Sequence, residues 1–425
     1  MKRGAPVRGA LGTPEAGAAF ALEGYNHLDA PLRSSGHQPR RHALCLPDMR
    51  FAGSPALFLL AVLAACGADS ASAPADDALV APPVAVRTLT GATSVEVLPE
   101  GDTGLPVRSD ARGLNASGQV TGAQFGLTPL SEDFAPYRST PGSVGVALAG
   151  CCGAQWGADI NDAGVLAGTM QSGLLEGSRG FVATRTSMVT LPILPDADPE
   201  GSAGAVAINA GGQIVGYSPS ATGRHAVLWS AASIIHDLGT LGGSTSEAID
   251  VNASGLVIGK SLTADDAATH FFVWSAETGM VDLNAQLGAI TSVVEINDAG
   301  QIIGSYATAA GEGHAFLYTP GSGLRDLGTL GGTTSAPTGL NDAGQVVGSS
   351  TLADGSTHAF LWTPTDGIDD ITAVTGINTV RRLNDKLQTL AGAVAVPTSL
   401  PSFATSGDPL LVQLDFTPTA SKATR

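Results

Sequence analysis

The sequence predicts an all-β protein: a seven-bladed β-propeller of four-stranded antiparallel blades, with its ring closed by an N-terminal strand. The stretch INDAGQIIG at 296–304 returns as LNDAGQVVG at 340–348 and in weaker form elsewhere, at steps of 43 to 48 residues. Each step holds four short apolar segments separated by turns, a repeat typical of propeller blades. The 55 glycines among 425 residues also suit many tight turns. An open β-solenoid is the alternative architecture.

The repeat is explained by one hairpin in each blade. Its asparagine can accept hydrogen bonds from backbone N–H groups just ahead of it, and its glycine, as at Gly300 and Gly344, suits the left-handed conformation of a bulged hairpin. An EF-hand calcium loop would need acidic residues at alternating positions, which NDAG lacks. The asparagines recur at Asn115, Asn161, Asn209, Asn252, Asn297, Asn341 and Asn384.

The four strands of a blade can be followed in order in the sixth repeat. We expect them at SAPTGLN (335–341), QVVGSS (345–350), HAFLWT (358–363) and GIDDI (367–371). The seventh repeat ends with PLLVQLDF (409–416) and lacks a fourth strand. VAVRTLTG at 84–91 resembles the missing segment, so we expect the N-terminal strand to complete the last blade and remove its open edge.

The segment before the propeller has the pattern of a bacterial export signal. Residues 49–65 combine Arg50 with an apolar run too short to span a bilayer; they end in Leu63-Ala64-Ala65, and Cys66 follows. This ending resembles the lipobox of bacterial lipoproteins, which implies that Cys66 is lipidated. Gly67 rather than aspartate follows, which favours the outer membrane. An ordinary signal peptide with a cysteine near its cleavage site is the alternative.

The remaining boundaries follow from composition. We interpret 1–48 as disordered or as lying upstream of a true start at Met49, 66–83 as a flexible tether, 84–416 as the propeller and 417–425 as a disordered tail. Residues 1–65 hold seven basic and four acidic residues, whereas the rest holds 14 basic and 34 acidic residues. A body this acidic repels phosphate backbones, so nucleic acid is not an expected partner.

A second recurring pattern concerns the third strand of the central blades. It reads HAVLW at 225, HFFVW at 270, HAFLY at 314 and HAFLW at 358, with DLGTLGG at 237 and 326. These segments resemble the bacterial extracellular HAF-repeat family. The resemblance implies an extracytoplasmic location, but it implies no activity. We expect each of these histidines to hydrogen-bond a loop of its own blade and not to bind a metal.

The candidate ligand-binding residues lie two positions before the repeated asparagine, on the innermost strand. Alternation predicts that this position faces the central channel, where Asp159, Asp250 and Glu295 would converge with Arg382. Channel carboxylates can bind a cation such as Ca²⁺, and they can also serve as acid and base in a glycan-cleaving site. A hydrated channel without a ligand is the third interpretation, and no other cofactor is expected.

The vicinal pair Cys151-Cys152 forms the last candidate site. Adjacent cysteines in an oxidising compartment can close a strained disulfide, which could stack on a ligand beside Trp156; two free thiols are the alternative. The sequence contains no phosphate-binding glycine loop with a lysine, GxSxG, HExxH or CxxC motif, so we assign no catalytic residue.

The sequence therefore predicts a monomeric outer-membrane lipoprotein, periplasmic or at the cell surface, attached to the membrane only through its lipid anchor. We expect a binding or scaffolding module for an envelope glycan or protein, since propeller faces present many loops on a rigid frame. The alternatives are a polysaccharide lyase or glycoside hydrolase that uses the channel carboxylates, and a purely structural envelope protein.

Overall fold

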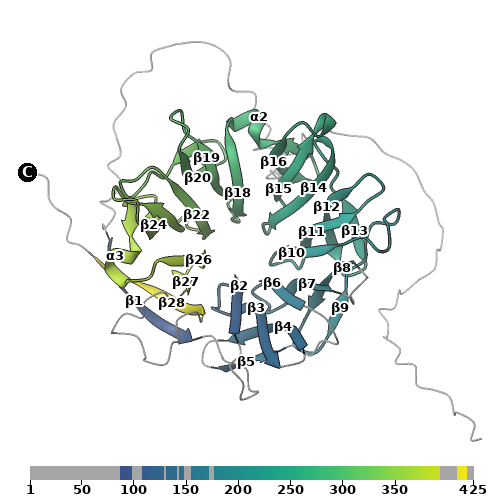
Figure 1. The fold of residues 1–425 in the computed structure, drawn as a ribbon, viewed down its shortest axis with the longest axis horizontal. Helices are drawn as coiled ribbons and strands as arrows, with labels where there is room; N and C mark the ends of the chain where they lie inside the picture. The colour runs from purple at the N-terminus through teal and green to yellow at the C-terminus, as the bar shows by residue number, and fades with distance from the viewer. Residues whose placement is uncertain are drawn as a thin grey trace, which may run out of the picture. The chain divides into compact units, whose positions relative to one another are not determined.

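The computed structural model describes residues 87–97, 108–128, 131–140, 143–147, 155–171, 177–392 and 409–418, all within the unit Ser54–Arg425. These residues form seven four-stranded antiparallel sheets arranged as blades around a central channel (Figure 1). The predicted seven-bladed propeller is confirmed. Cys66, Cys151 and Cys152 lie outside the described residues.

Each of the first three blades is a meander whose strands follow one another along the chain, the innermost first. Blade one contains β2 (Arg108–Leu114), β3 (Val120–Thr128), β4 (Ser131–Thr140) and β5 (Ser143–Ala147). Blade two contains β6 (Gln155–Ile160), β7 (Leu166–Gln171), β8 (Ser178–Ala183) and β9 (Met188–Thr190). Blade three contains β10 (Gly204–Ile208), β11 (Ile214–Pro219), β12 (Arg224–Ala231) and β13 (Ile234–Asp237).

The next three blades repeat this order and show the clearest periodicity. Blade four contains β14 (Gly242–Val251), β15 (Val257–Thr263), β16 (Thr269–Ser275) and β17 (Gly279–Asp282). Blade five contains β18 (Ile290–Ile296), β19 (Ile302–Ala307), β20 (Gly313–Thr319) and β21 (Gly323–Asp326). Blade six contains β22 (Ser335–Leu340), β23 (Val346–Thr351), β24 (Thr357–Thr363) and β25 (Gly367–Asp370).

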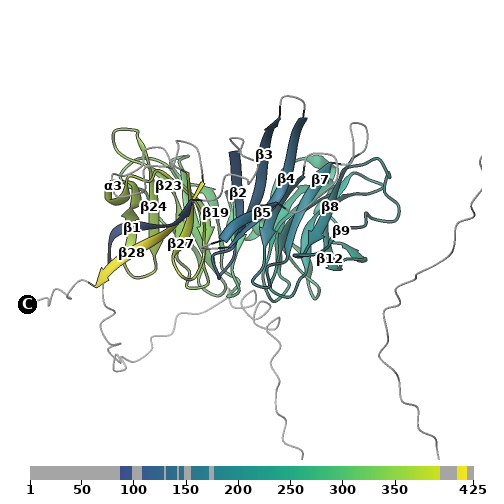
Figure 2. The same cartoon turned by 90° about the horizontal axis from the view of Figure 1, so that it is seen from below.

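The seventh blade joins the two ends of the described chain. Its strands are β26 (Thr379–Leu383), β27 (Gln388–Gly392), β28 (Pro409–Pro418) and, outermost, β1 (Arg87–Val97). β1 pairs antiparallel with β28, and both views show the two strands side by side (Figures 1 and 2). The prediction that the N-terminal strand completes the last blade is therefore confirmed.

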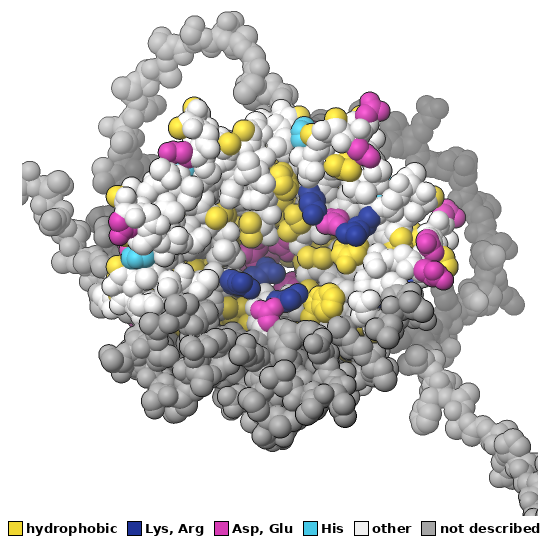
Figure 3. Space-filling view, in the orientation of Figure 1, with side chains coloured by type: hydrophobic (Ala, Val, Ile, Leu, Met, Phe, Trp, Pro, Cys, Tyr) yellow, Lys and Arg dark blue, Asp and Glu magenta, His cyan; other side chains and the backbone are white. Residues whose placement is uncertain are grey.

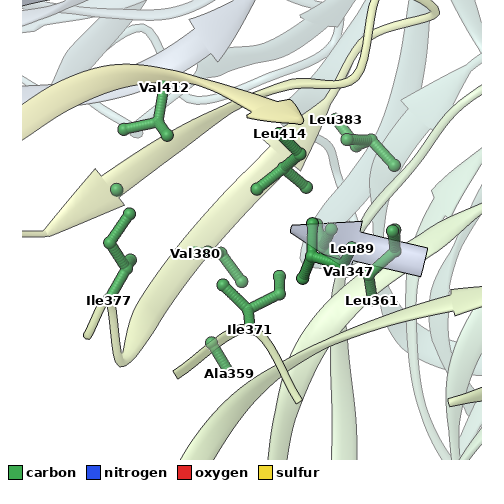
Figure 4. Packing of buried hydrophobic residues seen from close by; sticks show 11 residues of the cluster. Leu89, Val347, Ala359, Leu361, Ile371, Ile377, Val380, Leu383, Val412 and Leu414 are labelled. Carbon is green, nitrogen blue, oxygen red and sulfur yellow. The ribbon is translucent and has the colours of Figure 1, made fainter. Parts of the chain in front are cut away.

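Apolar side chains between the blades hold the seventh blade in place. Leu89 of β1 belongs to a buried cluster with Val412 and Leu414 of β28 and Val347 and Leu361 of blade six (Figure 4). Burying a leucine side chain stabilises a fold by about 1.5–3 kcal/mol. The closing strand thus contributes packing as well as hydrogen bonds.

Helices are short and peripheral. α2 (Leu283–Leu287) and α3 (Ile371–Thr375) each begin after a fourth strand, and each is capped by an aspartate that accepts a hydrogen bond from a first-turn N–H. A 3₁₀ turn, η1 (Ala264–Asp266), lies between β15 and β16. None of the helices in the described part of the chain is long and apolar enough to cross a membrane.

Candidate functional site

The central channel is ringed at one end by the repeated asparagines, here called the turn asparagines. Each one accepts a hydrogen bond from the backbone N–H four residues ahead, as Asn252 does from Leu256, so the predicted bonds to N–H groups just ahead are confirmed. Asn115, Asn252 and Asn384 also accept from the N–H two residues ahead, the bond that defines an Asx-turn. Gly300 and Gly344 have φ of 74° and 72°, the left-handed conformation that the hairpin was expected to need. All seven turn asparagines are buried.

The turn asparagines also form a continuous circle of hydrogen bonds between blades. In every blade the side-chain Nδ2 donates to the backbone oxygen of the turn asparagine in the next blade, at 2.9–3.4 Å. The last link runs from Asn384 Nδ2 to Asn115 O at 3.1 Å, so the circle is closed. This second role of the asparagine was not predicted from the sequence.

A group of four exposed aspartates, here called the turn aspartates, surrounds the same end of the channel. Each follows a turn asparagine, and its carboxylate accepts a hydrogen bond of 2.7–2.9 Å from the backbone N–H of the residue at the matching position in the preceding blade. The turn aspartates are Asp162, Asp298, Asp342 and Asp385. The described part of the chain gives none of them an ion-pair partner.

Partial burial and repulsion by its neighbours act on one of the turn aspartates, Asp342. Burial raises the pKa of the Asp342 carboxyl above its usual range, and the nearby charges of Asp298, Asp385 and Asp162 raise it further. This end of the channel therefore carries uncompensated negative charge.

The predicted inner carboxylates, Asp159, Asp250 and Glu295, lie deeper in the same channel together with Arg382. All four residues line one cavity of about 200 Å³ with the turn asparagines and turn aspartates. One water takes up about 30 Å³ in the liquid, so the cavity has room for several waters or one small charged group. The structure thus brings the predicted residues together; their role in ligand binding stays a prediction.

Each inner carboxylate already links two blades. The backbone N–H groups of Ile208, Ile296 and Leu340 donate to the carboxylates of Asp159, Asp250 and Glu295 at 3.0, 2.9 and 2.8 Å. In each case the donor immediately precedes the turn asparagine of the following blade. The inner carboxylates therefore contribute to the frame as well as to the lining of the channel.

Glu295 and Arg382 form an ion pair inside the channel. Arg382 Nη1 donates to Glu295 Oε1 at 2.8 Å, and Arg382 Nε donates to the backbone oxygen of Arg112 at 3.1 Å. Burial disfavours the charge on Arg382, but Glu295, Asp159 and Asp250 outweigh it and raise the pKa of the guanidinium. Arg382 therefore stays charged.

Unlike Glu295, Asp250 has no ion-pair partner among the described residues. Burial raises the pKa of its carboxyl to about 7, and Glu295 and Asp159 add repulsion that Arg382 and the Ile296 N–H only partly offset. Burial also raises the pKa of Glu295. Asp250 is thus a buried carboxyl that changes charge near neutral pH.

The recurring histidines lie away from the channel and bind within their own blades. His225, His270, His314 and His358 pair through Nδ1 with the aspartate at the end of the fourth strand, at 2.7–2.9 Å. A contact within each blade was expected and is confirmed, but the expected loop partner is wrong: the partner is an aspartate 12 residues ahead, the last residue of the fourth strand. Among the described residues, no group of three or more histidines, cysteines or acids is arranged to hold a metal ion.

Comparisons with known proteins assign the chain to no family. No protein-family model matches the chain, and no curated protein matches it. Solved structures similar to the chain include TolB from Acinetobacter baumannii, at 11% identity over 62% of this chain and 64% of that one, with a TM-score of 0.40. The β-propeller domain of the Trilobed protease from Pyrococcus furiosus is 9% identical over 62% and 81% of the two chains, with a TM-score of 0.45.

A six-bladed fungal lectin from Aleuria aurantia is also similar, at 11% identity over 70% of this chain and 97% of that one, with a TM-score of 0.33. The chain spans less than two thirds of the A. baumannii TolB chain. At such identities these likenesses extend to the propeller fold and no further.

Proposed function

We propose that the protein is a binding module of the bacterial cell envelope, and that the acidic end of its central channel recognises a positively charged group. The observation that carries this proposal is the uncompensated charge of the turn aspartates around a cavity whose deeper lining holds Asp159, Asp250 and Glu295 against the single cation Arg382. Opposite charge at a channel mouth attracts and orients a ligand.

The frame around the cavity supports recognition because it is held rigid before any ligand arrives. The closed circle of turn asparagines fixes the turns of all blades relative to one another. Backbone N–H groups of the preceding blade hold the carboxylates of the four turn aspartates. A site that is already ordered loses little conformational entropy on binding.

The envelope location rests on the N-terminal segment. The sequence Leu63-Ala64-Ala65-Cys66 supports lipidation at Cys66, and the tether after it would let the propeller stand off the membrane. The resemblance to HAF repeats agrees with an extracytoplasmic location. We place the protein at the outer membrane, in the periplasm or on the cell surface.

One observation favours a catalytic alternative. Asp250 has a pKa of about 7 and lies in the same lining as Glu295, so a protonated and an ionised carboxyl can coexist there, as a glycan-cleaving site requires. Against it, both oxygens of Asp250 already accept backbone N–H bonds, from Ile296 and Val251. We therefore place binding first.

The test compares two polymers with the same sugar backbone, one with charged amines and one with neutral acetamides. The purified protein is incubated with chitosan, which carries free amines, and with chitin of the same length, whose amines are acetylated, with and without calcium. We expect retention on chitosan and much less on chitin. Asp342→Asn should weaken retention several-fold, whereas Asp196→Asn, the same change at an exposed turn away from the channel, should not.

The other outcomes decide between the remaining functions. Soluble fragments would identify an enzyme and make Asp250 and Glu295 the first residues to substitute. A calcium requirement would assign the inner carboxylates to a cation. Equal retention on both polymers would contradict recognition of positive charge, and no retention on either would favour a protein partner or a purely structural role.

A further inference from the structure

Basic side chains gather at the end of the channel opposite the turn aspartates. Every inner strand runs toward its turn asparagine, so residues three to five positions earlier lie toward the other end. At this end lie Arg112 and Arg381 with Asp110 and Trp156, a group here called the arginine opening. Arg382 lies one position nearer the turn asparagine, in the wall of the cavity already described. On the face shown in Figure 3, basic side chains gather beside the central opening, with acidic side chains visible behind them.

The backbone of blade seven departs from the other blades at this point. In the first six blades a β-bulge falls on the third residue before the turn asparagine, whereas in blade seven it falls on Arg382, the second residue before it. Arg382 has φ of 54°, a left-handed conformation that is strained for a residue with a side chain. Bulges of this kind redirect side chains and occur next to functional sites.

The consequence of the shifted bulge is that two consecutive arginines reach the same neighbouring strand. Arg382 Nε donates to the backbone oxygen of Arg112 on β2, and Arg381 Nη1 lies 3.9 Å from Asp110 Oδ1 on that strand. Gly339 of blade six leaves room for this arrangement, because a Cβ there would lie 2.7 Å from Arg382 Cα. In a regular strand, adjacent side chains point to opposite faces, so it is the shifted bulge that lets Arg381 and Arg382 both reach β2.

The charges of the arginine opening are not balanced. Asp110 is shared between Arg112, whose Nε donates to it at 2.9 Å, and Arg381 at 3.9 Å. The Arg381 side chain is 64% exposed, and its guanidinium has no other polar partner within the described chain. A guanidinium offers five N–H donors in a fork that matches a carboxylate. Arg381 is therefore an open anion-binding group on a protein whose net charge is −17.

Trp156 adds a flat apolar surface beside these charges. The guanidinium carbon of Arg112 lies 6.0 Å from the centre of the indole ring, and the ring is only partly buried. An indole ring can cover the apolar face of a sugar, while a guanidinium beside it pairs with a carboxylate on that sugar. A sugar acid satisfies both features.

We propose that the arginine opening binds a single uronic acid residue at the end of a saccharide, with its carboxylate on Arg381 and Arg112 and its ring against Trp156. A long polyuronate fits less well, because the acidic body surrounding this small basic area repels every further carboxylate. This site lies at the other end of the channel from the turn aspartates and does not depend on the function proposed for them.

The test measures binding of methyl glucuronoside and methyl glucoside to the purified full-length protein by calorimetry or ligand-observed NMR. We expect the uronoside to bind at least about tenfold more tightly than the neutral glycoside, the effect of one charge-assisted hydrogen bond. Arg381→Gln should remove this preference, whereas Arg185→Gln, an equal charge change in an exposed turn, should keep it. Chitosan retention should be unaffected by Arg381→Gln.

A substitution that increases affinity gives a stricter test than one that decreases it. Asp110→Asn removes the carboxylate that competes for Arg381 and Arg112, so it should tighten uronoside binding by about two- to fivefold, which misfolding could not imitate. Equal binding of both glycosides, no binding of the uronoside, or an unchanged Arg381→Gln variant would overturn the proposal. Binding of a short peptide with a free C-terminus, but not of its amide or of the uronoside, would overturn the sugar assignment and give the carboxylate to a peptide.

Discussion

Glu295 of blade five reaches past blade six to Arg382 of blade seven, with Glu295 Oε1 accepting from Arg382 Nη1 at 2.8 Å. Its second oxygen accepts from the Leu340 N–H of blade six at 2.8 Å. The position two before the turn asparagine in blade six is Gly339, so no side chain separates the pair. One carboxylate therefore ties three blades together at the wall of the channel.

Replacing Glu295 by Gln should destabilise the protein because it leaves the Arg382 guanidinium without its closest counter-charge. We expect a loss of about 2 kcal/mol, below the 3–5 kcal/mol typical of a fully buried pair, since Asp159 and Asp250 remain nearby. Urea unfolding measures it. Glu247→Gln is the matched control: Glu247 pairs with Lys260 and Arg224 at the surface and should cost less than about 1 kcal/mol. Equal losses would show that the channel pair has no special role.

Asp250 should make the stability of the protein fall as the pH rises from about 4 to 7. Its folded-state pKa of about 7 lies above its ordinary value of 3.8, so the folded state holds a proton that the unfolded state releases in this range. Burial is the main reason that ionising Asp250 is unfavourable, and repulsion from Glu295 and Asp159 adds to it. The cost is at most roughly 4 kcal/mol, with the favourable effect of Arg382 already included. Unfolding measured from pH 4.5 to 8 should show a flatter curve for Asp250→Asn. Parallel curves for the two proteins would contradict the raised pKa.

Replacing Asn252 by Asp tests the circle of turn asparagines. The aspartate keeps the oxygen that accepts from the backbone N–H groups of Leu256 and Ser254. It loses the Nδ2 group that donates to Asn297 O at 3.1 Å in the unchanged protein. A buried acceptor left unpaired costs about 1–3 kcal/mol, and the buried charge adds to it. Gln286→Glu, the same amide-to-acid change at an exposed helix position, should change the melting temperature little. If both variants melt alike, the circle contributes nothing measurable.

Deleting residues 84–91 should lower the melting temperature sharply. The deletion removes the first part of β1, including Leu89, and exposes both the edge of β28 and the apolar cluster beneath it. Deleting residues 68–75, which precede the closing strand, removes the same length of chain and is the control. A melt that is unchanged by the first deletion would show that the ring holds without its closing strand.

Cys66→Ser should release the protein from membranes into the soluble fraction, because a lipid anchor is the membrane attachment expected from the sequence. Cell fractionation followed by detection of the propeller measures it, with the unchanged protein as the reference. If the Cys66 variant still sediments with membranes, lipidation at this cysteine is wrong.

Much of the fold could be predicted because each blade repeats the same local chemistry. The turn asparagine and its glycine identify the hairpin without knowledge of the rest of the chain. The closing strand was predictable because 84–91 resembles a segment that the seventh repeat lacks. The convergence of Asp159, Asp250 and Glu295 followed from strand alternation together with the closed ring.

The contacts between blades were harder to predict. The acceptor of each turn asparagine's second hydrogen bond is a backbone oxygen 43 to 48 residues away, or 269 residues away for the closing link. Every residue has a backbone oxygen, so the sequence does not indicate which one accepts the bond. The shifted bulge at Arg382 likewise depends on the packing of blade six. The histidine–aspartate pairs are different: their constant spacing of 12 residues was visible in the sequence and could have identified the partner.

The links of the asparagine circle are chemically identical, and all of them point the same way around. Any blade offers its predecessor the same oxygen and its successor the same amide, so a whole repeat could be duplicated or excised in evolution and its neighbours would still match. The asparagine links therefore do not determine how many blades the ring has. The number of blades is fixed elsewhere: the ring ends where β1, from the other end of the chain, supplies the strand that the seventh repeat lacks and pairs with β28.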